Sequence, residues 1–352
     1  MAVNVTYLLG AGASCERLPL VKEVKVDNMI VKPSFGTEIL ILASRYESLK
    51  EKMTIKVNDE DKKKIDEVTK SLRFLGENSI KFSSPDTFIK SLSLQGENDK
   101  IENVKKALSF FLTVKQHLDN NLPDSRYIPF LASILETKES KVQIPENINI
   151  LSWNYDFQLE LALSHFENFN SFADILKHFK IAPNIETKEL ESRVVHLNGI
   201  AGIMKNSYKS ETMFREIKAS PDQDELLIEF LRVFEHLGKN YDVNDLLSFA
   251  WELDDVNHER IQMAKRIMQK TKILVIIGYS FPFFNRKVDI QLLEPFIKNN
   301  DDNELHELKI YIQNPSIDES RIQFLRQRFG IEDKIVIEPL TNTTQFFLPP
   351  EL

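Results

Sequence analysis

Five short apolar runs, separated by much longer stretches of helical character, limit what this chain can fold into. The runs cover residues 3–9, 148–151, 273–277, 308–312 and 334–337, and they end in turn-forming residues. Near-continuous apolar runs of this length are typical of strands in a parallel sheet that helices cover on both faces. We therefore expect an α/β fold, namely a Rossmann-like, doubly wound parallel sheet.

The stretches between the runs carry helical periodicity. Apolar residues recur at three- and four-residue steps through residues 101–118, and another helix is expected over about residues 256–270. Ser220, Pro221 and Gln223 predict a capped helix that ends at Gly238. We predict one domain over residues 1–352. Its core takes residues 1–35, 141–207 and 269–345, and its two helical insertions take residues 36–140 and 208–268.

The composition excludes several classes of protein. Hydrophobic residues make up 42% of the chain, which is enough for a sizeable core and excludes a wholly disordered protein. The formal net charge of -8 argues against a dedicated nucleic-acid binder. Cys15 is the only cysteine, so no internal disulfide and no four-cysteine zinc site can form. The sequence shows no signal peptide and no long apolar stretch, so we expect a soluble, cytoplasmic protein. Because a cysteine zinc cluster is absent, we also expect that it needs no metal.

Glycine is scarce, and its positions point to a ligand site. Of ten glycines, four lie at strand ends or in the loops that follow them: Gly10, Gly12, Gly199 and Gly278. Ligands of open α/β sheets bind outside the carboxyl ends of the strands. The first loop reads Gly10-Ala11-Gly12-Ala13-Ser14. Gly10 permits a tight turn there, Gly12 lets amide groups approach a diphosphate, and Ser14 adds a hydroxyl donor. An ordinary glycine turn is the alternative.

Two further motifs place polar side chains after predicted strands. Asn154 and Asp156 follow the run at residues 148–151, and strand alternation would aim both the same way. The alternative for Asp156 is an N-cap of the helix expected from about residue 157. His196 follows a β-branched pair and precedes a turn at Gly199, where a structural histidine is the alternative.

The fourth motif follows the run at residues 273–277 and reads Gly278-Tyr279-Ser280-Phe281-Pro282. Gly278 and Ser280 are candidates to line the phosphates or the ribose of a ligand. The alternative is that the aromatic residues form a hydrophobic plug beneath the loop. Asn314, after the next run, is a candidate ribose partner.

The four motifs, in this order, resemble the SIR2-like family in the form found among bacterial defence proteins. Residues 10–14 resemble the family's GAG(I/A)S loop, and residues 153–156 resemble its (Q/T)NxD motif. Residues 196–199 resemble the HG motif with the active-site histidine, and residues 278–282 resemble the GYS-(F/L)-P segment. The resemblance covers the strand-rich thirds of the chain and says little about the helical insertions.

Departures from the sirtuin deacylases favour a different activity. One cysteine cannot supply their zinc module, Trp153 replaces the Gln of QNxD, and their PDFRG stretch is absent. The resemblance therefore implies a zinc-less NAD⁺ glycohydrolase that cleaves NAD⁺ to nicotinamide and ADP-ribose. It further implies an NAD⁺-depleting effector of an antiphage, abortive-infection response.

The resemblance also implies roles for the motif residues. Asn154 would orient a water or the ribose hydroxyls, His196 would act as a base, and Asp156 would hold the nicotinamide carboxamide or orient the site. The residues expected to cradle the dinucleotide are Gly10, Ala11, Gly12, Ala13, Ser14, Gly278, Tyr279, Ser280 and Asn314. Two alternatives stay open: a regulatory subunit that binds NAD⁺ or ADP-ribose without cleaving it, and an NAD-dependent deacylase or ADP-ribosyltransferase.

A toxic NAD⁺ hydrolase must be restrained, and no trigger-sensing region is recognisable in the sequence. We therefore expect a homo-oligomer, a partner protein from the same operon, or both, with no direct contact to nucleic acid or membrane. The apolar stripe formed by Leu227, Leu231 and Phe234 must be buried. We expect part of the apolar surface of the insertions to pack on the core and the remainder to form an oligomer or partner interface. The alternative is that the stripes pack only on each other.

Overall fold

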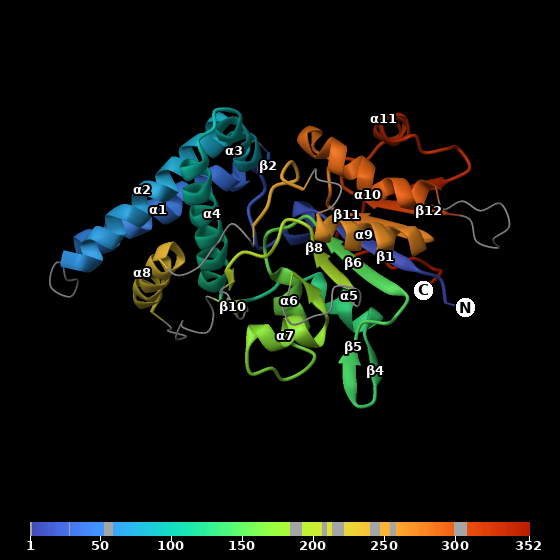
Figure 1. The fold of residues 1–352 in the computed structure, drawn as a ribbon, viewed down its shortest axis with the longest axis horizontal. Coiled ribbons are helices and arrows are strands. Elements are labelled where there is room, and N and C mark those ends of the chain that lie inside the picture. Colours follow the sequence, from blue (N-terminus) through green and yellow to red (C-terminus); the bar gives the residue numbers. More distant parts are fainter. Residues whose placement is uncertain are drawn as a thin grey trace. The chain divides into compact units, whose positions relative to one another are not determined.

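The chain divides into two compact units, each assembled from segments that are distant in the sequence (Figure 1). The first unit holds Met1–Ser14, Pro123–Gly199 and Ser248–Leu352, and the second holds Cys15–Leu122 and Ile200–Leu247. The computed structural model describes residues 2–27, 29–52, 59–183, 192–205, 210–212, 222–239, 247–253, 258–298 and 308–352.

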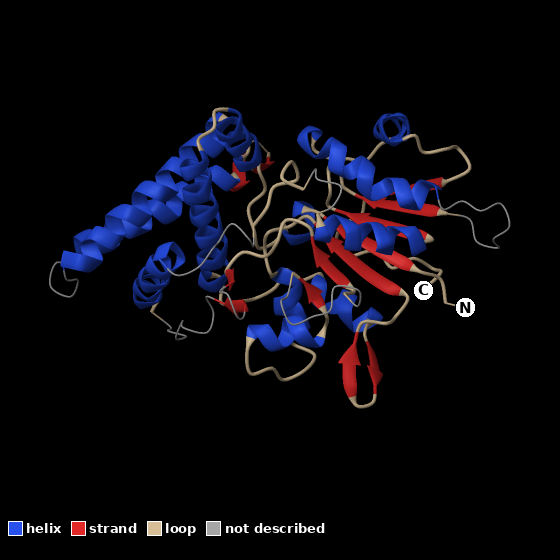
Figure 2. Cartoon of the chain, viewed as in Figure 1, coloured by secondary structure: helices blue, strands red, loops and turns tan. Residues whose placement is uncertain are grey.

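A seven-stranded sheet forms the centre of the first unit, as far as its residues are described (Figure 2). The strand order is β13-β12-β11-β1-β6-β8-β7, and each neighbouring pair is parallel. The strands are β1 (Val5–Leu9), β6 (Ile148–Ser152), β7 (Ile181–Ala182), β8 (Val194–His196), β11 (Ile273–Ile277), β12 (Lys309–Gln313) and β13 (Val336–Leu340). Every residue of β1, β6 and β11 is buried, as a sheet covered on both faces requires. The predicted Rossmann-like α/β fold is confirmed.

The order of the strands reverses between β1 and β11. On one side of β1 the chain adds β6 and then β8, and on the other side it adds β11, β12 and β13. Parallel crossovers are right-handed, so connections that run in opposite directions place their helices on opposite faces. The flanking helices are α5 (Tyr127–Ile134), α6 (Gln158–Leu163), α7 (Phe172–His178), α9 (Glu259–Lys270), α10 (Arg286–Lys298) and α11 (Glu319–Phe329). Sheets of this kind bind ligands at the carboxyl ends of the strands beside such a reversal.

Local sequence signals set the ends of several elements. The side chain of Asp318 accepts the amide hydrogen of Arg321 at 2.8 Å and caps α11, which ends before Gly330 in the left-handed conformation at φ 65°. A short 3₁₀ helix, η1 (Ala11–Ser14), follows β1, and another, η5 (Phe283–Asn285), precedes α10. A hairpin of β4 (Glu136–Lys138) and β5 (Lys141–Gln143) precedes β6.

The second unit is largely helical. Its elements are α1 (Phe35–Lys52), α2 (Asp59–Lys81), α3 (Pro85–Leu94), α4 (Asn98–Leu118) and α8 (Gln223–Lys239), with the hairpins β2 (Val24–Val26) with β3 (Met29–Lys32) and β9 (Ile203–Lys205) with β10 (Ser210–Thr212). Helices α1 and α2 approach closely because both have glycine at the contact. A Cβ on Gly76 would lie 2.9 Å from the Leu40 side chain and 3.0 Å from the carbonyl oxygen of Gly36.

The apolar stripe of α8 packs inside this unit. Leu227, Leu231 and Phe234 are buried, and the Phe234 ring centroid lies 4.9 Å from that of Phe110 in α4. The hydroxyl of Tyr46 in α1 donates to the carbonyl oxygen of Leu227 at 3.2 Å. The stripe is therefore not the partner surface that the sequence analysis allowed. Helix α8 extends one residue beyond the expected end, and Ser220 and Pro221 of its predicted cap lie outside the described residues.

Two helices lie in a different part of the molecule from the one the sequence suggested. Helices α5 and α9 overlap the predicted insertions 36–140 and 208–268, yet both belong to the unit with the sheet. The reason is packing: α5 contacts α6, and α9 contacts β8 and α10. Among the described residues, no helix has both the length and the apolar composition needed to cross a bilayer.

Candidate active site at the strand reversal

The two glycine loops lie directly against each other where the strand order reverses. The amide of Gly12, after β1, donates to the carbonyl oxygen of Gly278, after β11, at 3.0 Å. A Cβ on Gly278 would lie 2.5 Å from the amide nitrogen of Ala13, and one on Gly10 would lie 2.6 Å from the Cα of Tyr279. These glycines are needed so that two backbones can touch. The tight turn and the phosphate approach that the sequence analysis gave as their reasons are thus not their only constraint.

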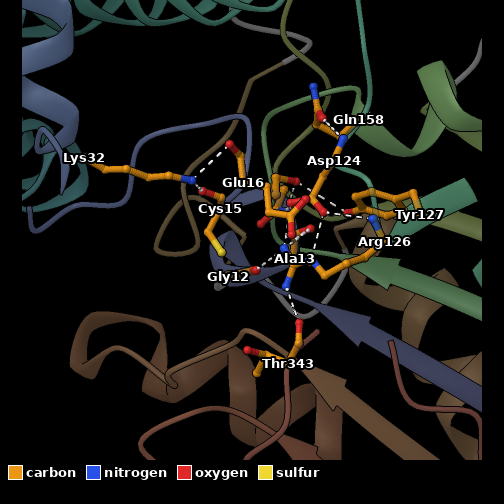
Figure 3. A network of polar contacts seen from close by, with 12 residues as sticks. Gly12, Ala13, Cys15, Glu16, Lys32, Asp124, Arg126, Tyr127, Gln158 and Thr343 are labelled. Atoms are coloured by element: carbon orange, nitrogen blue, oxygen red, sulfur yellow. Dashed lines mark hydrogen bonds and ion pairs between the residues drawn. The ribbon is translucent and has the colours of Figure 1, made fainter. Parts of the chain in front are cut away.

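A buried ion pair holds the first loop from one side (Figure 3). The guanidinium of Arg126 donates through Nη2 to the carbonyl oxygens of Gly12 at 3.0 Å and Ala13 at 3.1 Å. It also forms a two-point contact with the carboxylate of Asp124, at 2.8 Å and 2.6 Å. Both side chains are almost fully buried, so the charges compensate each other while the arginine fixes the position of the loop. Sequence analysis missed this pair because it lies within the predicted helical insertion.

Three predicted site residues meet at the end of the first loop. The side-chain amide of Asn154 donates to the hydroxyl of Ser14 at 3.3 Å, and the hydroxyl of Tyr127 lies 3.5 Å from the same oxygen. Asp156 also hydrogen-bonds to Ser14. All four side chains are buried. The loop after β1 and the loop after β6 thus build one polar cluster, in which Tyr127 of α5 was not predicted.

Asp156 supports the start of α6 but is not its N-cap, because Phe157 occupies that position. Its Oδ1 accepts the amide hydrogen of Gln158, the first residue of α6, at 3.0 Å. Burial raises the pKa of this carboxyl to about 6, although its hydrogen bonds to Gln158 and Ser14 lower it. A carboxyl with such a pKa changes charge close to neutrality, which is compatible with a chemical role as well as a structural one.

His196 ends β8 and is paired with a buried carboxyl group. Its Nε2 lies 2.8 Å from Oε1 of Glu160 in α6, and its Nδ1 lies 3.4 Å from the carbonyl oxygen of Asn154. Burial is the largest single effect and disfavours the charged imidazole, but Glu160, the carbonyl oxygen of Asn154 and Asp156 together outweigh it and raise the pKa of His196. Glu160 was missed because a glutamate between leucines in a short helix usually faces solvent.

The second loop is fastened by a buried polar network. The hydroxyl of Tyr279 donates to Oδ1 of Asp289 in α10 at 2.8 Å and accepts from Asn285 at 2.9 Å. Arg328 of α11 lies 3.5 Å from Oδ2 of the same carboxyl and donates to the carbonyl oxygens of Phe281 and Pro282. Tyr279, predicted to contact the dinucleotide, uses its hydroxyl here and stacks on Trp153. Its visible role is to hold the loop.

The remaining predicted contacts lie near the same edge of the sheet. Ser280 is exposed, and its carbonyl oxygen accepts a hydrogen bond from Arg321. The side-chain oxygen of Asn314 accepts the amide hydrogen of Ser316 at 2.9 Å and forms a local turn. A pocket of about 530 Å³ opens at the carboxyl ends of β12 and β13, lined mainly by the segment that follows β13. The amide of Gly278 donates to the carbonyl oxygen of Gln313 in this pocket wall at 3.0 Å, so pocket and loop are neighbours.

The buried carboxyl of Asp289 gives a testable effect on stability. Burial raises its pKa to about 7, well above the value of about 4 expected in an unfolded chain. The protonated form therefore stabilises the fold. This contribution is complete below about pH 4 and is lost as the pH rises through about 7. Between about pH 5 and about pH 8, we expect Asp289 to lower the free energy of unfolding by about 2–3 kcal/mol.

In the variant Asp289→Asn, most of this change in the free energy of unfolding should disappear. Urea denaturation at about pH 5 and at about pH 8 measures the change. Asp333→Asn, at a fully exposed position of the same unit, is the matched control and should follow the wild type. Equal pH dependence in Asp289→Asn and the wild type would contradict the assignment.

Comparison of the chain with protein-family models, with curated proteins and with solved structures finds no significant match. The described residues contain no group of three or more His, Cys, Asp or Glu side chains that could hold a metal ion. The chemistry of the site rests on its own residues. They bring an amide, a carboxyl group and an imidazole together beside two tightly packed glycine loops.

Proposed function

We propose that this protein is an NAD⁺ glycohydrolase, which cleaves NAD⁺ to nicotinamide and ADP-ribose. One observation carries the proposal: motifs predicted separately from the sequence converge on one cluster at the strand reversal. Ser14 from the first loop contacts Asn154, and the carbonyl oxygen of Asn154 lies 3.4 Å from the imidazole of His196. The proposal also draws on the resemblance of these motifs to the SIR2-like family.

The position of the cluster supports a dinucleotide as substrate. A nucleotide at the strand reversal would lie along the two glycine loops, as ligands of open α/β sheets do. Its adenosine half would enter the pocket at the carboxyl ends of β12 and β13. Its nicotinamide ribose would then face Ser14, Asn154 and Asp156.

The proposed reaction is a hydrolysis. The bond between C1′ of the ribose and the nicotinamide nitrogen breaks, and its electron pair leaves with nicotinamide. A water oxygen bonds to C1′, and the proton that this water loses passes through His196 to solvent. Asn154 would orient the water or the ribose hydroxyls, and Asp156 would hold the carboxamide. The scheme uses no metal.

The test is to incubate the purified protein with NAD⁺ and to quantify both products by chromatography and mass spectrometry. We expect equal amounts of nicotinamide and ADP-ribose. NADH is the control substrate, because its uncharged dihydronicotinamide is a poor leaving group and should stay intact. Binding of NAD⁺ or ADP-ribose without cleavage would favour a regulatory subunit. Transfer of ADP-ribose, or deacylation of a protein, would favour an NAD-dependent ADP-ribosyltransferase or deacylase.

The physiological role in this proposal follows from the resemblance. Depletion of NAD⁺ would serve an antiphage response, and a partner protein or a homo-oligomer would restrain the enzyme. Because the α8 stripe is buried within the helical unit, a partner would have to use other surfaces. The assay should therefore be repeated with the products of neighbouring genes.

A further inference from the structure

The His196–Glu160 pair is almost completely buried in the candidate site. The exposed fraction is 1% for His196 and 0% for Glu160, so water does not solvate either group. Nε2 of the imidazole lies 2.8 Å from Oε1 of the carboxyl group. At this distance the two groups share a proton in a strong, charge-assisted hydrogen bond.

Both ring nitrogens of His196 face oxygen atoms. Nε2 faces the Glu160 carboxyl group, and Nδ1 faces the main-chain carbonyl oxygen of Asn154 at 3.4 Å. A carbonyl oxygen can only accept a hydrogen bond, and an ionised carboxylate likewise has no proton to donate. When Glu160 is ionised, the ring satisfies both contacts only if both of its nitrogens carry a proton, which is the imidazolium form.

The second carboxyl oxygen of Glu160 makes this carboxyl group depend on the charge of its neighbour. Among the described residues, Oε2 of Glu160 is buried and has no hydrogen-bond partner. An ionised carboxylate in this position, with a single hydrogen bond, requires a positive charge beside it. The imidazolium of His196 is the charge that contacts it.

Other ionisable groups face His196 from the surrounding elements. Asp156, before α6, raises the pKa of His196 further, while burial opposes that effect. Leu197 follows His196 in the chain, and its carbonyl oxygen accepts a hydrogen bond from Arg260 of α9 at 3.0 Å. Arg260 also donates to the hydroxyl of Ser248. The carboxyl groups adjoin the imidazole itself, whereas the arginine contacts only the neighbouring backbone.

We propose that Glu160 is a positioning residue that holds His196 as an imidazolium at neutral pH and so sets the pH at which the site gains its base. The charge state of His196 is independent of the proposed function, whereas its effect on the reaction rate rests on that function. In the hydrolysis, His196 must first lose the Nδ1 proton that faces the carbonyl oxygen of Asn154, before Nδ1 can take a proton from the attacking water. The rate should therefore rise with pH through the His196 titration.

The charge state is measured directly in the protein without NAD⁺. Nitrogen–proton correlation spectra of the ¹⁵N-histidine-labelled full chain report which ring nitrogens are protonated. For His196, assigned with the variant His196→Gln, we expect both nitrogens to be protonated at pH 7. A neutral His196 ring at that pH would overturn the proposal, and this result needs no variant of Glu160.

The variant Glu160→Gln keeps the shape of the side chain and removes its charge. It should lower the titration midpoint of His196 by at least about one pH unit. Glu167→Gln is the matched control, because Glu167 lies 3.1 Å from Nε2 of another histidine, His178, in the same unit. It should leave His196 unchanged. An unchanged His196 midpoint in folded Glu160→Gln would overturn the proposal.

Activity supplies the second readout. If NAD⁺ is cleaved, the acidic limb of the pH profile should shift to lower pH in Glu160→Gln, whereas a loss of rate with the same pH dependence would contradict the proposed role. If NAD⁺ is not cleaved at any pH, the proposed function fails. The spectra still decide whether Glu160 sets the charge of His196.

Discussion

Replacing Gly278 with alanine is expected to lower the free energy of unfolding by about 2–5 kcal/mol. Two effects add up. The residue has φ +64°, a conformation that costs a residue with a Cβ about 1–2 kcal/mol. The new Cβ would also lie 2.5 Å from the amide nitrogen of Ala13 and from the Cα of Gly12. The neighbouring atoms belong to backbone, so one of the two loops must move.

Gly330→Ala separates the two effects. Gly330 lies in the same unit at φ +65°, and a Cβ added there would have no heavy atom within 4 Å. This variant should lose only the conformational part, about 1–2 kcal/mol. Urea denaturation of both variants, followed by circular dichroism, measures the difference, which we attribute to the contact between the loops. Equal losses in the two variants would contradict that contact.

The strands and the glycine loops were predictable because their signals are local. Ile273–Ile277 is an apolar run that ends in glycine, and it forms β11 with the predicted bounds. Gly10 and Gly278 were recognised because glycine is rare in this chain and follows strands. Each signal needs only the neighbouring residues, and the parallel order of the sheet then brings the loops together.

The supports of the site were not predictable because their partners are distant in sequence. Arg126 reaches the carbonyl oxygens of Gly12 and Ala13, more than a hundred residues away, and nothing near it in the sequence indicates this. Glu160 pairs with His196 across 36 residues, and Arg328 of α11 approaches Asp289 of α10, with β12 between the two helices in the sequence. From the sequence alone, charged residues such as these are expected at the protein surface, and only the fold shows that they are buried.

The fold also changed the interpretation of individual residues. Tyr279 was expected to contact the dinucleotide, but its hydroxyl is bound by Asp289 and Asn285. Asp156 was expected to serve either as an N-cap or in catalysis. Phe157 is the N-cap, and Asp156 instead accepts the amide hydrogen of Gln158 and takes a place in the Ser14 cluster. A sequence motif indicates which residues gather, and only the contacts separate those that hold the site from those that are free to act.

Removing the side chain of Asn154 should abolish most of the proposed activity with little effect on folding. Asn154→Ala loses a hydrogen bond to Ser14 of 3.3 Å, and we expect nicotinamide release to fall by at least about 100-fold. Asn149→Ala is the matched control, because Asn149 is also 6% exposed and lies near the start of β6, away from the site. Similar activity in the two variants would exclude Asn154 from the chemistry.

His196→Ala should reduce nicotinamide release at least as strongly, because the site then has no imidazole to carry the proton of the attacking water. This variant also leaves Glu160 buried without its partner, which costs about 3–5 kcal/mol of stability. The rate must therefore be expressed per folded molecule, with the folded fraction taken from circular dichroism. The double variant Glu160→Gln with His196→Gln removes both charges together, so it should regain stability but not activity. Recovery of nicotinamide release in that double variant would show that His196 is not the base.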